Sequence, residues 1–149
     1  MIKTVPYEPE HAYAILERNV RDRDLWLSNF PEWEKWAKTW KEGGPAETIF
    51  IDDEPVCSAG IVLIGWQRGE AWSLLSTLFY KHVRACYRII KKRFDEMIKE
   101  NNLVRVQTLI SPDFTESARL AEHLGFDQEG LLRKYGPNHE DLMIYGRVC

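Results

Sequence analysis

The chain has 149 residues, of which 44% are hydrophobic and 29% charged, and its formal net charge at pH 7 is −3. These values are typical of one globular domain over residues 1–149, and the negative charge argues against binding of nucleic acid or an anionic membrane through overall charge. No apolar run approaches the roughly 20 residues that span a bilayer, and residues 1–10 lack the apolar segment of a secretion signal. We therefore expect a cytoplasmic protein that does not enter a membrane.

The first half of the chain predicts a strand, two helices and three further strands. Residues 2–6 favour a strand, and the apolar periodicity of residues 10–19 favours a helix. Trp33, Trp36 and Trp40 lie at i, i+3 and i+7, so they share one face of a second helix that ends at a glycine pair. Strand-like runs follow at residues 47–51, 56–64 and 71–77. Turn sequences separate these runs, which predicts an antiparallel meander.

The second half predicts a long helix, a strand, another helix and a hairpin. From Val83 to Met97, apolar residues recur at alternating steps of four and three, and this stripe must cover a sheet. The later elements are a strand at 103–110, a helix with Asp113 or Thr115 as N-cap and Gly125 as its stop, and strands at 130–135 and 142–148. A helix that joins two strands in this way connects parallel neighbours. The sequence therefore predicts an α+β, or mixed α/β, domain.

Two stretches connect this order of elements with a known family. The sequence "FTESARLAEHLGF" resembles the final-helix signature N-x-x-A-x-x-x-Y-x-x-x-G-F of the GCN5-related N-acetyltransferase (GNAT) superfamily, and a hairpin follows it as it does in that family. The resemblance covers nearly the whole chain and implies a central mixed, mostly antiparallel sheet of about seven strands flanked by about four helices. The run "LLST…H-x-x-RA-x-R" is also similar to acetyltransferase-like proteins of tailed phages, which would lie in the host cytoplasm or the virion.

In the GNAT family a coenzyme A thioester lies between two splayed central strands, beside the helix that follows the first of them. The resemblance therefore implies an N-acetyltransferase that moves an acetyl group from acetyl-CoA to an amine of a small molecule or protein. The residues that it implies for acetyl-CoA binding are Leu74, Leu75, Ser76, Thr77, Tyr80, Lys81, His82, Val83, Arg84, Ala85, Phe114 and Ser117.

The expected pyrophosphate loop departs from the family pattern Q/R-x-x-G-x-G/A, which falls on residues 80–85. Only the last position conforms, and Val83 replaces the glycine that lets the backbone approach a phosphate. Lys81, His82 and Arg84 crowd the start of the following helix, where the helix dipole favours an anion. These side chains either bind phosphate in place of glycine amides or form a solvated basic face.

Catalysis needs a proton acceptor and a proton donor. An acceptor ammonium must lose a proton before it can attack, and Glu70, just before the central strand, is the candidate base. The family tyrosine that protonates the leaving thiolate falls on Ala121, so Tyr135 is a substitute by residue type. Further acidic candidates near the hairpin are Glu129, Glu140 and Asp141. Each of these residues also fits an ordinary turn, packing or surface role.

The tryptophan face of the second helix allows three interpretations: an aromatic wall of the acceptor pocket, part of the core, or a surface for a homodimer or protein partner. The last would suit the main alternative function, a catalytically inactive GNAT-fold interaction protein or phage virion-associated protein. A nucleic-acid reader is disfavoured, because the acidic second half of the long helix would repel phosphate.

Potential metal ligands are scattered along the sequence. Cys57, Cys86 and Cys149 form no CxxC pair, and the histidines have no partner at ligand spacing. We therefore expect neither a disulfide framework nor a metal site.

Overall fold

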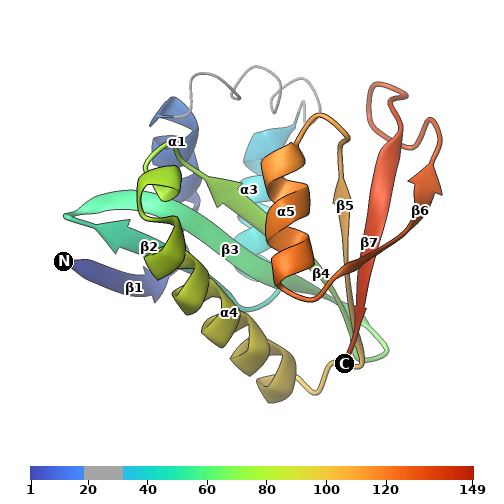
Figure 1. Ribbon diagram of the computed structural model, residues 1–149, viewed down its shortest axis with the longest axis horizontal. Helices are drawn as coiled ribbons and strands as arrows, with labels where there is room; N and C mark the ends of the chain where they lie inside the picture. The colour runs from blue at the N-terminus through green and yellow to red at the C-terminus, as the bar shows by residue number, and fades with distance from the viewer. Residues whose placement is uncertain (19–31) are drawn as a thin grey trace.

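A seven-stranded sheet of strand order β1-β2-β3-β4-β5-β7-β6 organises the computed structural model, which describes residues 1–18 and 32–149 (Figure 1). The strands are β1 (Ile2–Pro6), β2 (Ala46–Ile51), β3 (Glu54–Gly65), β4 (Arg68–Leu75), β5 (Arg105–Ile110), β6 (Asp127–Leu132) and β7 (Leu142–Val148). Strands β4 and β5 are parallel, and the other neighbours are antiparallel. The predicted meander and the predicted parallel crossover are both confirmed.

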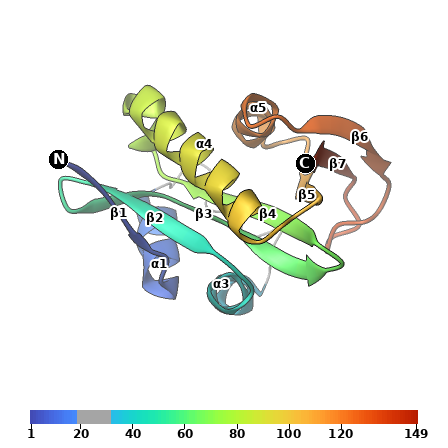
Figure 2. The same cartoon turned by 90° about the horizontal axis from the view of Figure 1, so that it is seen from below.

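Four α-helices in the described part of the chain cover the two faces of the sheet. They are α1 (Pro9–Arg18), α3 (Trp33–Glu42), α4 (Val83–Glu100) and α5 (Thr115–His123). Figure 2 shows α4 and α5 on one face and α1 and α3 on the other. Asn19, the predicted end of the first helix, lies outside the described residues. None of the described helices has the length and apolarity needed to cross a bilayer.

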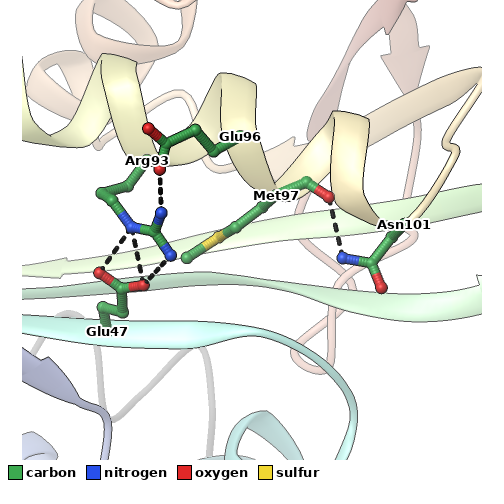
Figure 3. Close-up of polar contacts among 5 residues, drawn as sticks. All are labelled: Glu47, Arg93, Glu96, Met97 and Asn101. Carbon is green, nitrogen blue, oxygen red and sulfur yellow. Dashed lines mark hydrogen bonds and ion pairs between the residues drawn. The ribbon is translucent and has the colours of Figure 1, made fainter.

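Helix α4 packs across the sheet through its predicted apolar stripe. Phe94 and Met97 are buried, and full burial of such a side chain contributes about 1.5–3 kcal/mol. Arg93 of the same helix donates hydrogen bonds to Glu47 of β2, with its Nε at 2.9 and 3.0 Å from the two carboxylate oxygens, and it also pairs with Glu96 (Figure 3). These contacts fix α4 over β2 and thereby set the position of its amino end.

On the opposite face, aromatic side chains join α3 to β4 and α1. The rings of Trp40 and Trp72 stack with centroids 4.5 Å apart, and Trp33 meets Tyr13 of α1 edge-on at 4.4 Å. Trp40 is buried, whereas Trp36 keeps 45% of its surface exposed. The tryptophan face of α3 therefore contributes to the core, and Trp36 is its most exposed member.

Strand β4 ends at Leu75, before the predicted end at Thr77. The Ser76 hydroxyl accepts the N–H of Leu78 at 3.2 Å, and the Ser76 carbonyl accepts the N–H of Phe79 at 3.0 Å. These bonds turn the chain into a short helical turn before α4, so the prediction that Ser76 and Thr77 continue the strand is wrong.

The start of α5 also differs from the prediction. Phe114 occupies the N-cap position, and neither Asp113 nor Thr115 caps the helix. The reason is a turn in which the Ser111 carbonyl accepts the N–H of Phe114 at 3.0 Å. At the other end Gly125 has φ 92°, which confirms it as the predicted stop.

Strand β6 lies earlier in the chain than the predicted segment 130–135. Lys134 adopts a left-handed conformation with φ 54°, and its N–H donates to the Asp141 carboxylate at 2.9 Å. Because this geometry belongs to a turn, Tyr135 lies in the hairpin between β6 and β7 and not in a strand.

Candidate functional site

Strands β4 and β5 pair over a short distance and then separate. Their register joins Arg68 to Arg105, Gly69 to Val106 and Glu70 to Gln107, and no pair follows these. Beyond this point the two strands diverge, with α5 in front of the gap (Figure 1).

A side chain closes the base of the gap. The Thr108 hydroxyl donates to the Ala71 carbonyl at 2.9 Å, so this carbonyl faces β5. Orientation alternates along a strand, and Ser73 therefore turns its N–H and C=O to the same edge. Ser73 has no partner in β5, which leaves a strand edge that can hydrogen-bond an extended ligand.

A cavity of about 750 Å³ fills the gap, a volume that suits a ligand of cofactor size. The residues lining it come from both strands, from α3, from α5 and from the β6–β7 hairpin. They include Trp36, Glu70, Trp72, Ser73, Leu74, Leu75, Tyr80, Leu109, Phe114, Ser117, Tyr135 and Glu140. The structure thus gathers seven of the residues expected from the sequence, Glu70, Leu74, Leu75, Tyr80, Phe114, Ser117 and Tyr135, around one space.

The amino end of α4 lies beside the end of β4 (Figure 1). The N–H groups of Val83, Arg84 and Ala85 have no acceptor among the described residues, and no side chain caps the helix. Such a helix end carries a partial positive charge, to which exposed Lys81 and His82 add cationic capacity. This combination suits a phosphate group.

Val83 does not have the positive φ that would require a glycine. Its side chain is 46% exposed, and it forms the first residue of α4. The local backbone therefore forms with ordinary helical geometry, so the glycine of the family pattern is not needed for the conformation of this loop.

Ser76 and Thr77 do not line the cavity. Ser76 is fully buried, and its N–H donates to the Val56 carbonyl at 2.9 Å. Thr77 is exposed in the turn that follows. The structure therefore gives Ser76 a part in the turn that directs the chain from β4 to α4.

Glu70 is the last residue of β4 that pairs with β5, and its side chain is half-buried in the cavity wall. Burial raises the pKa of this carboxyl above its ordinary value. A carboxylate with a raised pKa accepts a proton more readily, which suits a general base.

The four candidate residues in and near the β6–β7 hairpin have different surroundings. Tyr135 is 61% exposed at the edge of the cavity, and Glu140 lines it. Glu129 forms a two-bond ion pair with Arg105 at 2.5 and 3.0 Å, and Asp141 holds the turn. Glu129 and Asp141 therefore have structural partners outside the cavity.

Sequence reasoning did not single out Trp72, Gln107 or Thr108. Trp72 follows the candidate base Glu70 by two residues, and this proximity could have indicated that it lines the cavity. The role of Thr108 depends on its register against β4, for which a single sequence carries no signal.

No family model and no curated protein matches this chain. Solved structures do match it. The ribosomal-protein-S5-alanine acetyltransferase of Vibrio fischeri is 20% identical, with a TM-score of 0.71 over 99% of this chain and 92% of that one. A GNAT-family acetyltransferase of Bacillus anthracis is 16% identical, with a TM-score of 0.73 over 99% and 94%. A ribosomal L7/L12 alpha-N-protein acetyltransferase in complex with coenzyme A is 14% identical, with a TM-score of 0.71 over 99% and 93%. The chain therefore has the GNAT acetyltransferase fold.

Proposed function

We propose that this protein transfers an acetyl group from acetyl-CoA to an amine. The observation that carries the proposal is the separation of β4 and β5 next to the uncapped amino end of α4. The same fold occurs in a structural neighbour that was solved with coenzyme A. Acetyl-CoA supplies an activated thioester, and the amine is the nucleophile.

The residues present fit coenzyme A in two respects. The free edge at Ser73 offers a donor and an acceptor to the amide groups of the pantetheine arm. The N–H groups of residues 83–85, which have no acceptor in the described part of the chain, and the side chains of Lys81 and Arg84 suit the pyrophosphate. The cavity also reaches both faces of the sheet, since it is lined by Trp36 of α3 and by Ser117 of α5.

The proposed reaction begins when Glu70 accepts a proton from the acceptor ammonium. The free amine attacks the thioester carbon, a C–N bond forms and the C–S bond breaks. A backbone N–H at the free edge of β4 polarises the carbonyl oxygen. The nitrogen, positively charged after attack, gives up its second proton as the amide forms, and this proton replaces the one that Tyr135 or water donates to the leaving thiolate. The thiolate leaves readily because the ordinary pKa of a thiol is only about 8.5. Ala121, which is buried in the core, takes no part.

Thermal unfolding with and without acetyl-CoA, followed by measurement of thiol release with a panel of amines, tests the proposal. At about 100 times its dissociation constant, acetyl-CoA should add roughly 2.7 kcal/mol to the free energy of unfolding. Absence of any stabilisation at millimolar acetyl-CoA would overturn the proposal. The control is Glu70→Gln, which should bind acetyl-CoA and release thiol far more slowly.

A second candidate function is a binding protein that keeps the fold without turnover. The observation in its favour is the pair of departures at Val83 and Ala121, together with the exposed surface of Trp36, which could contact a protein partner or a second copy of the chain. Stabilisation by acetyl-CoA without thiol release from any amine would favour this candidate.

A further inference from the structure

The outer side of α4 carries a row of exposed basic residues. The row consists of Arg84, Arg88, Lys92 and Lys99, and we call it the outer stripe. At 3.6 residues per turn these four positions fall within about 80° of one another around the helix, and they span roughly 22 Å along it. Helix α4 forms, with α5, the outer layer on its face of the sheet, so the stripe faces solvent (Figure 2).

The side chains of the outer stripe form no ion pair with any residue in the ranges 1–18 and 32–149. Arg84 with Arg88, and Arg88 with Lys92, are like-charge pairs at i, i+4, and such pairs destabilise a helix. Cations also interact unfavourably with the amino-terminal end of a helix, where the dipole favours anions. An anion bound along the stripe would relieve both effects.

The acidic residues in the second half of α4 are mostly engaged by other cations. Asp95 pairs with Lys91 at 3.2 Å and with Arg147 of β7 at 3.0 Å. Glu96 pairs with Arg93 (Figure 3). The sequence suggested that carboxylates in this half of the helix would repel phosphate, but these two are neutralised within the fold.

The charge of α4 is opposite to that of the chain as a whole. The helix contains six basic and three acidic residues, whereas the chain has a net charge of −3. The third acidic residue, Glu100, is exposed, but it directly follows Lys99 and lies about 100° from it around the helix. The stripe is therefore a local positive surface, on the opposite side of the sheet from α1 and α3 (Figure 2).

The outer stripe has no apolar anchor beside it. Val83 is the only large hydrophobic residue of α4 that is exposed, and it lies at the start of the helix, before the stripe. A helix that lies on a membrane needs an exposed apolar face, and protein interfaces are centred on buried aromatic or aliphatic side chains. The phosphates of a nucleic acid need neither, because they bind cationic side chains directly. Charge complementarity without an apolar centre therefore favours a nucleic acid as the partner.

We propose that the outer stripe of α4 binds the phosphate backbone of a nucleic acid without reading its bases. Each strand of a duplex presents one phosphate per ~3.4 Å of its axis, so a stripe of roughly 22 Å faces about six phosphates. The stripe meets the proposed acetyl-CoA site only at Arg84, and its other three residues act outside that site.

Fluorescence anisotropy of a labelled DNA duplex of about 20 base pairs and of a labelled RNA strand of about 20 nucleotides, measured across salt concentrations, tests the proposal. For four phosphate contacts, the logarithm of the binding constant should fall against the logarithm of the salt concentration with a slope of about −3.6 for the duplex and about −2.8 for the strand. The affinity for the duplex should thus fall about 100-fold between about 50 and about 200 mM salt.

Lys92→Gln removes one cation of the stripe from an exposed position, so the slope for the duplex should decrease in magnitude by about 0.9 while acetyl-CoA binding and thermal stability stay as in the wild type. The double variant Arg88→Gln with Lys92→Gln should decrease it by about 1.8. Lys38→Gln is the matched control, because Lys38 is exposed on α3 on the other face of the sheet and the change of charge is the same. Its slope should equal that of the wild-type protein.

Absence of binding to both nucleic acids at about 50 mM salt would overturn the proposal. An equal change of slope in Lys92→Gln and Lys38→Gln would also overturn it, because binding would then follow the net charge of the protein and not the stripe. Polyglutamate and vesicles that contain phosphatidylserine serve as competing anions. If either binds more tightly than the nucleic acids and is weakened by Lys92→Gln, the stripe belongs to an acidic protein segment or an anionic membrane, and the nucleic-acid assignment is wrong.

Discussion

His11 Nδ1 lies 2.8 Å from the Thr48 hydroxyl and accepts the N–H of Glu8 at 3.0 Å. Because Nδ1 accepts the Glu8 N–H, it carries no proton, and the Thr48 hydroxyl must donate to it. Thr48 in turn accepts from Ser58, whose oxygen is 2.8 Å away. His11 belongs to α1, Thr48 to β2 and Ser58 to β3, so these hydrogen bonds join the start of α1 to two strands. Thr48 and Ser58 are fully buried.

This arrangement predicts a loss of stability in mild acid. Burial lowers the pKa of His11 below 6.5, an effect opposed by Glu8 and Glu10 and assisted by Lys41. As the pH falls below about 6.5, the unfolded chain gains the proton first, and the free energy of unfolding decreases until the folded-state pKa is passed. Above about pH 7 the full contribution of His11 to the free energy of unfolding is present. Urea denaturation at a series of pH values measures it.

The control for this prediction is His11→Asn, whose amide oxygen can take the place of Nδ1 without titrating. Its stability should fall less between pH 7 and pH 5 than that of the wild-type protein. An equal fall in both proteins would contradict the role of His11 and assign the acid sensitivity to other groups. His11→Ala should lose about 1–3 kcal/mol at neutral pH, because it leaves the Thr48 hydroxyl buried without its acceptor.

Arg84→Ala tests the phosphate role of the amino end of α4. Arg84 is exposed in the first turn, beside N–H groups for which residues 1–18 and 32–149 supply no acceptor. We expect the dissociation constant for coenzyme A to rise about tenfold, with little change in thermal stability, since one charge-assisted contact is lost from a solvated position. Arg88→Ala, one turn farther along, is the matched control. Equal affinity in wild type and Arg84→Ala, measured by calorimetry at low salt, would mean that Arg84 is only part of a basic surface.

Val83→Gly restores the glycine of the family pattern. Because Val83 already has an ordinary negative φ, we expect the affinity for coenzyme A to change by less than about threefold and the stability to fall by up to about 1 kcal/mol. Calorimetry and thermal unfolding measure the two effects. If binding instead becomes more than tenfold tighter, the Val83 side chain obstructs the phosphate.

Some features of the fold and the site follow from local sequence patterns, whereas others depend on tertiary geometry. The buried stripe containing Phe94 and Met97 follows from the 3.6-residue repeat of a helix, which is a local property, so α4 and its crossover were predictable. The hydrogen bond from Thr108 to Ala71 joins residues 37 positions apart and depends on strand register, so the sequence could not predict it. Glu70 was a candidate because acids at this edge of the central strand often serve enzymes of the resembling family. The structure places it within β4 and not just before the strand, and its burial could be assessed only in the fold.

Replacement of Glu70 tests the chemistry of the proposed site. Glu70→Gln keeps the size of the side chain and removes the proton acceptor, so we expect kcat to fall about 10²- to 10⁴-fold while the affinity for coenzyme A is unchanged. In the wild-type protein, burial raises the pKa of Glu70, and the carboxylate form is present only above this raised pKa. The value of kcat/KM should therefore fall as the pH is lowered through it. Thiol release measured across pH in both proteins gives the answer: the acidic limb should be missing in Glu70→Gln, and a variant that retains both the limb and the rate would show that another group accepts the proton.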